Sequence, residues 1–236
     1  MRCSLTIAYD GTNFLGSQTQ KESKNTVLGA LESALKKINI ETKIVASGRT
    51  DRGVHATGQV CHIEIPTYWA NTTKLQLSLQ KILPPSILIK KIKITDDTFH
   101  ARYSAKRRVY RYIIKVAKSN PFEDNFVTFV DDIDFLKIQK NIKLFCGTFD
   151  FKLFMKSGSD VKSTSRVIYR AFAYRHKGFI ILNFEANGFL RSQIRLMVGA
   201  LLKLDEQEIT QQLECRVNHK IKPAKSNGLY LSKIKY

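Results

Sequence analysis

A short segment between two apolar stretches concentrates side chains that could do chemistry. Residues 46–60 read ASGRTDRGVHATGQV, in which Arg49, Asp51, Arg52 and His55 are interspersed with glycines. A hairpin turn needs Gly, Asn or Asp for its backbone, but not this density of charge. Loops at strand ends that hold reactive side chains on a rigid scaffold do have such a composition. The segment is therefore a candidate active-site loop.

Asp51 is the residue of this loop best suited to catalysis. Perturbed carboxylates concentrate at functional sites, where an ionised Asp can act as a nucleophile or as a base. The more common role of an Asp beside a turn glycine is to hydrogen-bond its own backbone, so both interpretations stay open. The loop has no second carboxylate, which disfavours paired glycosidase chemistry. It also lacks the pattern of a nucleophile elbow.

The charge of the chain indicates a polyanion partner. The 236 residues include 39 Lys and Arg against 20 Asp and Glu, which gives a formal net charge of +19. Ten basic side chains and two acidic ones lie in residues 90–118, interleaved with Phe99, Tyr103, Tyr110 and Tyr112. Positive charge with stackable rings is typical of a nucleic-acid-binding surface. A general role of the charge in solubility is the alternative.

Several other classes of function are disfavoured. No apolar run approaches the ~20 residues that cross a bilayer. The N-terminus reads as a strand and has no signal-peptide features, so we expect a cytoplasmic protein without membrane contact. The cysteines and histidines have no spacing typical of zinc ligands, and there is no GxGxxG or P-loop motif. We therefore expect neither a metal nor a cofactor.

The hydrophobic pattern predicts an α+β fold with two similar halves. The first half has predicted strands and helices at residues 2–9, 26–38 (a helix capped by Asn25), 42–47, 57–65, 71–82 (a helix) and 86–95. The second half has them at residues 107–116, 133–145 (a helix), 165–175, 178–186, 188–203 (a helix) and 228–235. Both halves have the order β-α-β-β-α-β. We expect an N-terminal subdomain of residues 1–100 and a C-terminal subdomain of residues 101–236, with sheets that join edge to edge.

Two elements of the second half carry further candidates. Tyr110 and Tyr112 share one face of the predicted strand RRVYRY. Buried core tyrosines are the common case, and a base-stacking platform is the functional alternative. Arg191 and Arg195 lie one turn apart beside the apolar stripe of the predicted helix 188–203. They either extend to solvent or reach a buried carboxylate.

The segment GRTDRGVHATGQV resembles the signature loop of tRNA pseudouridine synthases of the TruA type. Other segments match that family in the same order and cover nearly the whole chain: YDGTNFLG (9–16), TVLGALESAL (26–35), FHARYSAKRRVYRY (99–112), SRVIYR (165–170), NGFLRSQIRLMVGALL (187–202) and GLYL (228–231). The resemblance implies a pseudouridine synthase fold, in which two subdomains with a joined antiparallel or mixed sheet form a central basic cleft. The N-terminal subdomain would carry the Asp loop, and the C-terminal subdomain the Tyr strand and the Arg helix.

The resemblance also implies roles for single residues. Asp51 matches the essential aspartate of the family, and Arg195 matches the arginine that pairs with it. Tyr110 matches the tyrosine that stacks against the target uracil, and Arg49 matches the loop arginine linked to extruding the nucleotide. We place Arg191 and His55 among the substrate-binding residues.

The chain departs from the family pattern at a few positions. Ser17 stands where the family usually has Trp, and Arg191–Ser192 stands where it usually has two histidines. Arg52 replaces a residue that is often Ala or Lys. None of these departures falls on the Asp, Tyr or Arg positions, so they bear on RNA contacts more than on chemistry.

The function implied by the resemblance is the isomerisation of uridine to pseudouridine in tRNA. The expected target is the anticodon arm, at positions 38–40, and the expected enzyme is a homodimer that needs no cofactor and no metal. A non-catalytic basic RNA-binding module fits the charge and the strand aromatics equally well, and only Asp51, Tyr110 and Arg195 argue against it. A nuclease would need several acidic ligands for a metal, and the loop supplies one.

Overall fold

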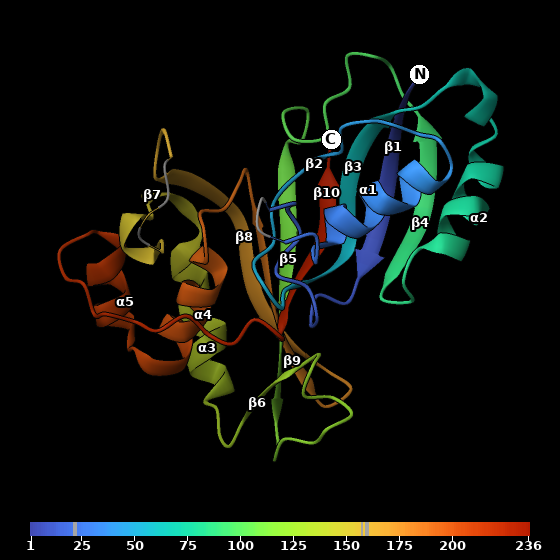
Figure 1. Ribbon diagram of the computed structural model, residues 1–236. Helices are drawn as coiled ribbons and strands as arrows, with labels where there is room; N and C mark the ends of the chain where they lie inside the picture. The colour runs from blue at the N-terminus through green and yellow to red at the C-terminus, as the bar shows by residue number, and fades with distance from the viewer. Residues whose placement is uncertain (21–22, 157, 159–160) are drawn as a thin grey trace. The chain divides into compact units, whose positions relative to one another are not determined.

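The computed structural model describes residues 1–20, 23–156, 158 and 161–236, which fall into two compact units. One unit consists of residues 1–106 and 230–236, and the other of residues 107–229. Each unit is a sheet with helices packed on it, which confirms the predicted α+β class (Figure 1). The joining of the two sheets, the central basic cleft and the division between residues 100 and 101 stay predictions.

The sheet of the first unit has the strand order β4-β1-β3-β10. Strands β1 (Arg2–Tyr9) and β3 (His55–Glu64) are antiparallel, as are β1 and β4 (Ile87–Ile94). The short strand β2 (Val45–Ala46) pairs with β3. The C-terminal strand β10 (Leu229–Lys235) runs parallel to β3, with Tyr230 opposite His55. The last strand of the chain thus supports the start of β3, where the candidate loop ends.

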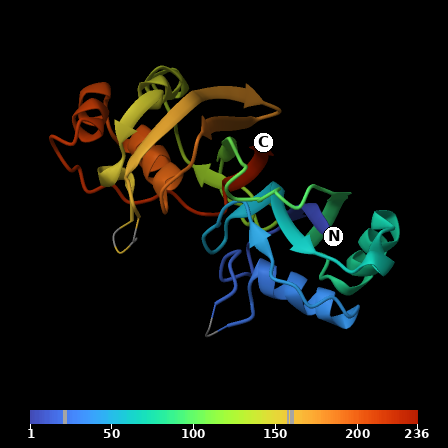
Figure 2. The same ribbon diagram turned by 90° about the horizontal axis from the view of Figure 1, so that it is seen from above.

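Helices α1 (Val27–Lys37) and α2 (Thr72–Ile82) lie against the sheet of the first unit (Figures 1 and 2). A short 3-10 helix, η1 (Thr67–Trp69), precedes α2. Strand β1 alternates between buried and half-exposed side chains, as the period of a strand requires. The predicted cap of α1 is wrong by one residue. Thr26 is the N-cap, because its hydroxyl accepts the N–H of Gly29 at 3.1 Å, whereas the amide of Asn25 donates to the carbonyl of Asn13.

The sheet of the second unit has the strand order β5-β9-β8-β7, with β6 parallel to β5. Its strands are β5 (Arg107–Val116), β6 (Thr128–Val130), β7 (Gly147–Asp150), β8 (Ser165–His176) and β9 (Phe179–Ala186). Its helical segments are α3 (Phe135–Asn141), η2 (Ile142–Phe145), η3 (Lys152–Phe154), α4 (Gln193–Lys203) and α5 (Glu206–Leu213). The predicted turn of the β8–β9 hairpin is confirmed, since Lys177 and Gly178 both have positive φ, at 47° and 81°.

The start of α4 corrects the helix predicted over residues 188–203. Ser192 has a left-handed backbone, with φ of 59°, so the helix begins only at Gln193. The side chain of Gln193 accepts the N–H of Leu190 at 2.8 Å and stabilises this turn. Arg191 therefore lies outside α4, and the one-turn spacing between Arg191 and Arg195 is wrong. A helical residue cannot have positive φ, and no residue type in this segment signals the break.

We predict that Gly58→Ala weakens the first unit. A Cβ at Gly58 on β3 would lie 2.3 Å from the carbonyl oxygen of Ser232 on β10. This oxygen belongs to the backbone of a paired strand, so it cannot move aside as the end of a flexible side chain could. The free energy of unfolding should fall by about 1–3 kcal/mol in urea denaturation. Gly188→Ala is the matched control, because its Cβ would meet only the Arg166 side chain, at 3.8 Å. Equal losses in the two variants would contradict the close approach of β3 and β10.

Candidate active site

The candidate loop is fastened to the first unit through Thr50, the residue before Asp51. The backbone N–H of Thr50 donates to the hydroxyl of Ser17 at 2.9 Å, and the N–H of Ser17 donates to the carbonyl of Thr50 at 3.1 Å. The hydroxyls of Tyr9 and Thr50 are hydrogen-bonded at 2.8 Å. Ser17 and Thr50 are buried, with 1% and 6% of their surface exposed. Buried hydrogen bonds of this kind fix the backbone, because breaking one leaves a desolvated polar group.

A second set of hydrogen bonds holds the start of the loop. The hydroxyl of Ser47 donates to Oε1 of Gln59 at 2.6 Å, and Nε2 of Gln59 donates to the carbonyl of Gly48 at 2.8 Å. Both side chains are buried. Gln59 lies on β3, so this side chain ties the loop to the strand that follows it.

A third contact holds the end of the loop against the segment after β1. The N–H of Gly11 donates to Nδ1 of His55 at 3.1 Å, and the same nitrogen lies 3.2 Å from Oδ1 of Asp10. A Cβ at Gly11 would lie 2.0 Å from the carbonyl oxygen of Val54, so only glycine fits there. The ring of His55 stacks on Tyr230 with centroids 4.7 Å apart. These contacts place His55 beneath the loop, and its predicted contact with substrate stays a prediction.

The fastened backbone presents its charged side chains outward. Arg49 and Arg52 are exposed and Asp51 is half-buried, while Thr50 and Val54 between and after them are buried. A turn closes the loop, since the N–H of Val54 donates to the carbonyl of Asp51 at 3.1 Å. The buried Thr50 before it and the hydrogen bond from Val54 to its carbonyl restrain the backbone of Asp51. This arrangement suits a carboxylate that must be held in one place.

The two tyrosines of β5 have different environments in the second unit. Tyr110 lies opposite Phe184 and Tyr112 opposite Leu182 on β9, which confirms that they share a face. The hydroxyl of Tyr112 bonds Thr128 Oγ1 at 2.7 Å and donates to the carbonyl of Lys225 at 2.8 Å. Burial raises the pKa of Tyr112 to about 12, against smaller lowering effects of the Thr128 hydrogen bond and the Arg195 charge. Tyr112 is a core residue.

Tyr110 retains a small exposed surface, 8% of its total. Phe189, in the turn before α4, packs edge-to-face against its ring, with centroids 5.3 Å apart and planes at 82°. This contact fixes the plane of the Tyr110 ring. A fixed ring plane is what a stacking role requires.

Arg195 projects from the first turn of α4 toward the segment that precedes β10. Its Nε donates to the carbonyl of Ala224 at 2.7 Å, and the N–H of Ala224 donates to the carbonyl of Arg195 at 2.9 Å. Because Nε belongs to the planar guanidinium, this bond sets the orientation of the whole group. Gly199 permits the close approach, since a Cβ there would lie 2.4 Å from the carbonyl oxygen of Lys222. Arg191 is exposed in the turn before the helix.

The six predicted site residues are thus divided between the units. Arg49, Asp51 and His55 belong to the first unit, and Tyr110, Arg191 and Arg195 to the second. Their joint action stays a prediction. The support of the loop by Thr50, Ser17, Tyr9 and Gln59 did not follow from the sequence, because these residues lie far apart in it. The one sequence feature that could have pointed to this support is Ser17, which stands where the family usually has Trp.

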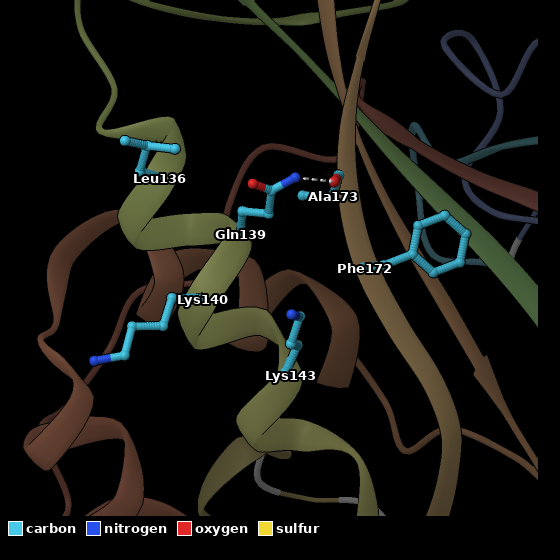
Figure 3. A pocket seen from close by; sticks show the side chains of 6 residues that line it. All are labelled: Leu136, Gln139, Lys140, Lys143, Phe172 and Ala173. Atoms are coloured by element: carbon cyan, nitrogen blue, oxygen red, sulfur yellow. Dashed lines mark hydrogen bonds between the residues drawn. The ribbon is translucent and has the colours of Figure 1, made fainter.

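A hollow of about 340 Å³ lies beside α3 in the second unit, and none of the residues that line it is a predicted site residue. It is lined by Leu136, Gln139, Lys140, Lys143, Phe172 and Ala173, and the amide of Gln139 donates to the carbonyl of Ala173 on β8 (Figure 3). This lining offers no carboxylate, thiol or hydroxyl for chemistry. Among the residues that the structure describes, no three or more His, Cys, Asp and Glu side chains are grouped so that they could hold a metal ion. The helices of this described part are too short or too polar to span a membrane.

Comparisons with known proteins identify the family. The chain matches the model of a family described as tRNA pseudouridine synthase over residues 5–104 and 142–236. It is 42% identical to a tRNA pseudouridine synthase A of Campylobacter jejuni (strain RM1221) over 241 residues, with 100% of both chains covered. It is 40% identical to one of Wolinella succinogenes, over 98% of this chain and 92% of that one.

Among solved structures, the chain is similar to one in the "Crystal Structure of a Cbf5-Nop10-Gar1 Complex". That likeness has a TM-score of 0.43 and 13% identity, and covers 85% of this chain and 45% of the other. It is too weak to add to the assignment, which rests on the sequence relatives. With a family match over most of its length and relatives about 40% identical from end to end, the chain belongs to the tRNA pseudouridine synthase family.

Proposed function

We propose that Asp51 is the catalytic carboxylate of this tRNA pseudouridine synthase and that Arg195 is its charged partner. The proposed substrates are uridines at positions 38–40 of the anticodon arm, and the proposed enzyme is a cytoplasmic homodimer. The observation that carries the proposal is the candidate loop, which holds its backbone by buried hydrogen bonds and displays Asp51 beside two exposed arginines. A loop that served only as a turn would not need this support.

The chemistry requires an ionised carboxylate in a fixed position. The reaction breaks the bond between the uracil ring nitrogen and the ribose, turns the base, and rejoins it through carbon 5. The hydrogen on carbon 5 leaves as a proton, and the ring nitrogen freed from the ribose takes up a proton. No electron is transferred, so the reaction has no need of a redox cofactor. The carboxylate either attacks the sugar or takes a proton from it. A guanidinium beside a buried carboxylate keeps it ionised, because the opposite charge offsets desolvation.

The remaining site residues fit the extraction of the base from the RNA. A paired or stacked uridine cannot be reached by a carboxylate, so it must be flipped out at a cost of a few kcal/mol. Arg49, exposed on the loop, would fill the vacated space or bind the displaced phosphate. Tyr110 would stack on the flipped uracil, and Arg191 would add a contact to the backbone. A net charge of +19 favours the polyanion and makes affinity fall with salt.

Asp51→Asn should abolish the release of tritium from carbon 5 of labelled uridine in unmodified tRNA. The amide has the size of the carboxylate but can neither attack the sugar nor accept its proton. Affinity for tRNA should stay within about threefold of wild type, which shows that the variant is folded. Asp131→Asn, at an exposed Asp of the second unit, is the matched control and should release tritium normally. Wild-type release by Asp51→Asn would remove Asp51 from the chemistry, and no release by the wild type would leave a non-catalytic RNA-binding protein.

Ser17→Ala should slow turnover without weakening the binding of tRNA. The change leaves the buried N–H of Thr50 without its acceptor, so the backbone next to Asp51 shifts to find another. A displacement of the order of 1 Å at a reacting group costs up to about 100-fold, and we expect kcat to fall 10- to 100-fold. Ser33→Ala, which removes the hydroxyl bonded to the Gly29 carbonyl in α1, should retain kcat. Equal kcat in the two variants would show that the loop does not depend on this bond.

Tyr110→Phe should retain most of the affinity for tRNA, and Tyr110→Ala should lose it. Phenylalanine keeps the ring that Phe189 holds in plane, whereas alanine removes the stacking surface. Stacking of one base is worth about 1–3 kcal/mol, so the two variants should differ by about that amount in titrations with tRNA. If Tyr110→Phe loses affinity as fully as Tyr110→Ala, the hydroxyl and not the ring makes the contact.

A further inference from the structure

The four aromatic residues of the basic segment 90–118 do not all face solvent. Tyr112 and Tyr110 are buried in the second unit, and Phe99 is half-buried against Tyr236 and His62. Tyr103 differs from them, because 78% of its surface is exposed. Tyr103 is therefore the most exposed of the four rings of this segment.

The exposed ring of Tyr103 is held in place by His100. The two rings are stacked, with centroids 4.4 Å apart and planes at 28°. Nδ1 of His100 accepts the backbone N–H groups of Arg102 and Tyr103 at 3.2 and 3.1 Å. The N–H of His100 donates to the hydroxyl of Ser104, and the N–H of Ser104 donates to the carbonyl of His100. Residues 100–104 therefore form a closed turn with one face of the tyrosine covered by a histidine.

The turn is anchored to the first unit through Ala101, which is fully buried. Its N–H donates to Nδ1 of His62 on β3 at 3.0 Å, and its carbonyl accepts the hydroxyl of Tyr236 at 2.9 Å. An aromatic side chain that is exposed and yet fixed by its turn loses little conformational entropy when a ligand binds. This is the property of a binding platform and is not needed for a solvent-facing turn.

The charge around Tyr103 indicates the kind of ligand. The guanidinium of Arg102 lies 5.6 Å from the centre of the ring, and Lys106 is also exposed. The nearest acidic residues in the sequence, Asp96 and Asp97, precede the turn, and none follows it before Glu123. A nucleotide combines a π face with a negative phosphate, and so it matches an exposed ring with a cation beside it.

We propose that Tyr103 is a stacking site for an unpaired base of the tRNA substrate, with Arg102 and Lys106 placed to contact the adjoining phosphates. The site uses none of the residues assigned to the reaction, and it gives the enzyme a second hold on the RNA. The proposal relies on the chain's membership of the tRNA pseudouridine synthase family to identify the RNA as tRNA, but it does not rely on the proposed role of Asp51.

The test compares the binding of unmodified tRNA by variants in an Asp51→Asn background, where turnover cannot alter the RNA. Tyr103→Ala should weaken binding about tenfold at fixed salt, and Tyr103→Trp should bind at least as well as the parent. Phe122→Ala is the matched control. Phe122 is 88% exposed but lies next to Glu123 and Asp124, so its loss should change the dissociation constant less than twofold.

Fluorescence gives a direct readout of stacking. The chain has a single tryptophan, Trp69, so Tyr103→Trp adds one emitter whose signal is obtained by subtracting the parent. Binding of tRNA should quench this signal, and high salt should restore it. Phe122→Trp should show no quenching.

Two results would overturn the proposal. One is an unchanged dissociation constant in Tyr103→Ala together with no quenching in Tyr103→Trp. The other is a change of oligomeric state in Tyr103→Ala, measured by sedimentation, that accounts for all of the lost affinity, which would make the ring a contact between copies of the chain. Neither depends on tritium release, so a failure of the catalytic assignment of Asp51 would appear separately.

Discussion

The reciprocal hydrogen bonds between Ser17 and Thr50 are the constraint on which the candidate site depends. A carboxylate that performs chemistry must be partly exposed to its substrate, so packing around the side chain holds it less firmly than it holds a core residue. Its position must be set by the backbone, which in turn must be held by groups that water cannot reach. Burial of Ser17 and Thr50 satisfies this requirement one residue away from Asp51. The polar residues beneath the loop therefore matter as much as the charged residues on it.

The elements were predictable where one physical pattern dominates them. Strand β5 and the β8–β9 hairpin followed from alternation and from a Lys–Gly turn, and their bounds were confirmed within one or two residues. The start of α4 was not predictable, because Ser192 adopts positive φ although serine has no preference for that region. Helix α5 was missed although its capping box, Asp205 with Glu208, was visible in the sequence. Its sequence EQEITQQL has two apolar residues, Ile209 and Leu213, and so lacks the hydrophobic period that predicts the longer helices.

In the candidate site, too, the sequence pattern predicts which face of the strand a residue occupies, whereas its burial depends on tertiary packing. Strand periodicity placed Tyr110 and Tyr112 on one face, and the pairing with β9 confirms it. Periodicity predicts which face of the sheet a residue lies on, but not how deeply that residue is buried. Tyr112 is closed off by Thr128 and the Lys225 carbonyl, and Tyr110 keeps a small exposed surface near the strand end. Thr128 lies 16 residues from Tyr112 in the chain and Lys225 lies 113 residues from it, so a local sequence pattern cannot predict that these groups close off Tyr112.

Replacement of the usual tryptophan by Ser17 is the clearest case in which structure changes the meaning of a sequence feature. From the sequence, this departure is expected to bear on RNA contacts more than on chemistry. In the structure Ser17 is buried, and its hydroxyl accepts a backbone N–H that would otherwise be desolvated without a partner. A tryptophan side chain offers no acceptor oxygen. In this chain Ser17 thus holds the backbone of Thr50, the residue before Asp51, and we expect the departure to act on the placement of the loop.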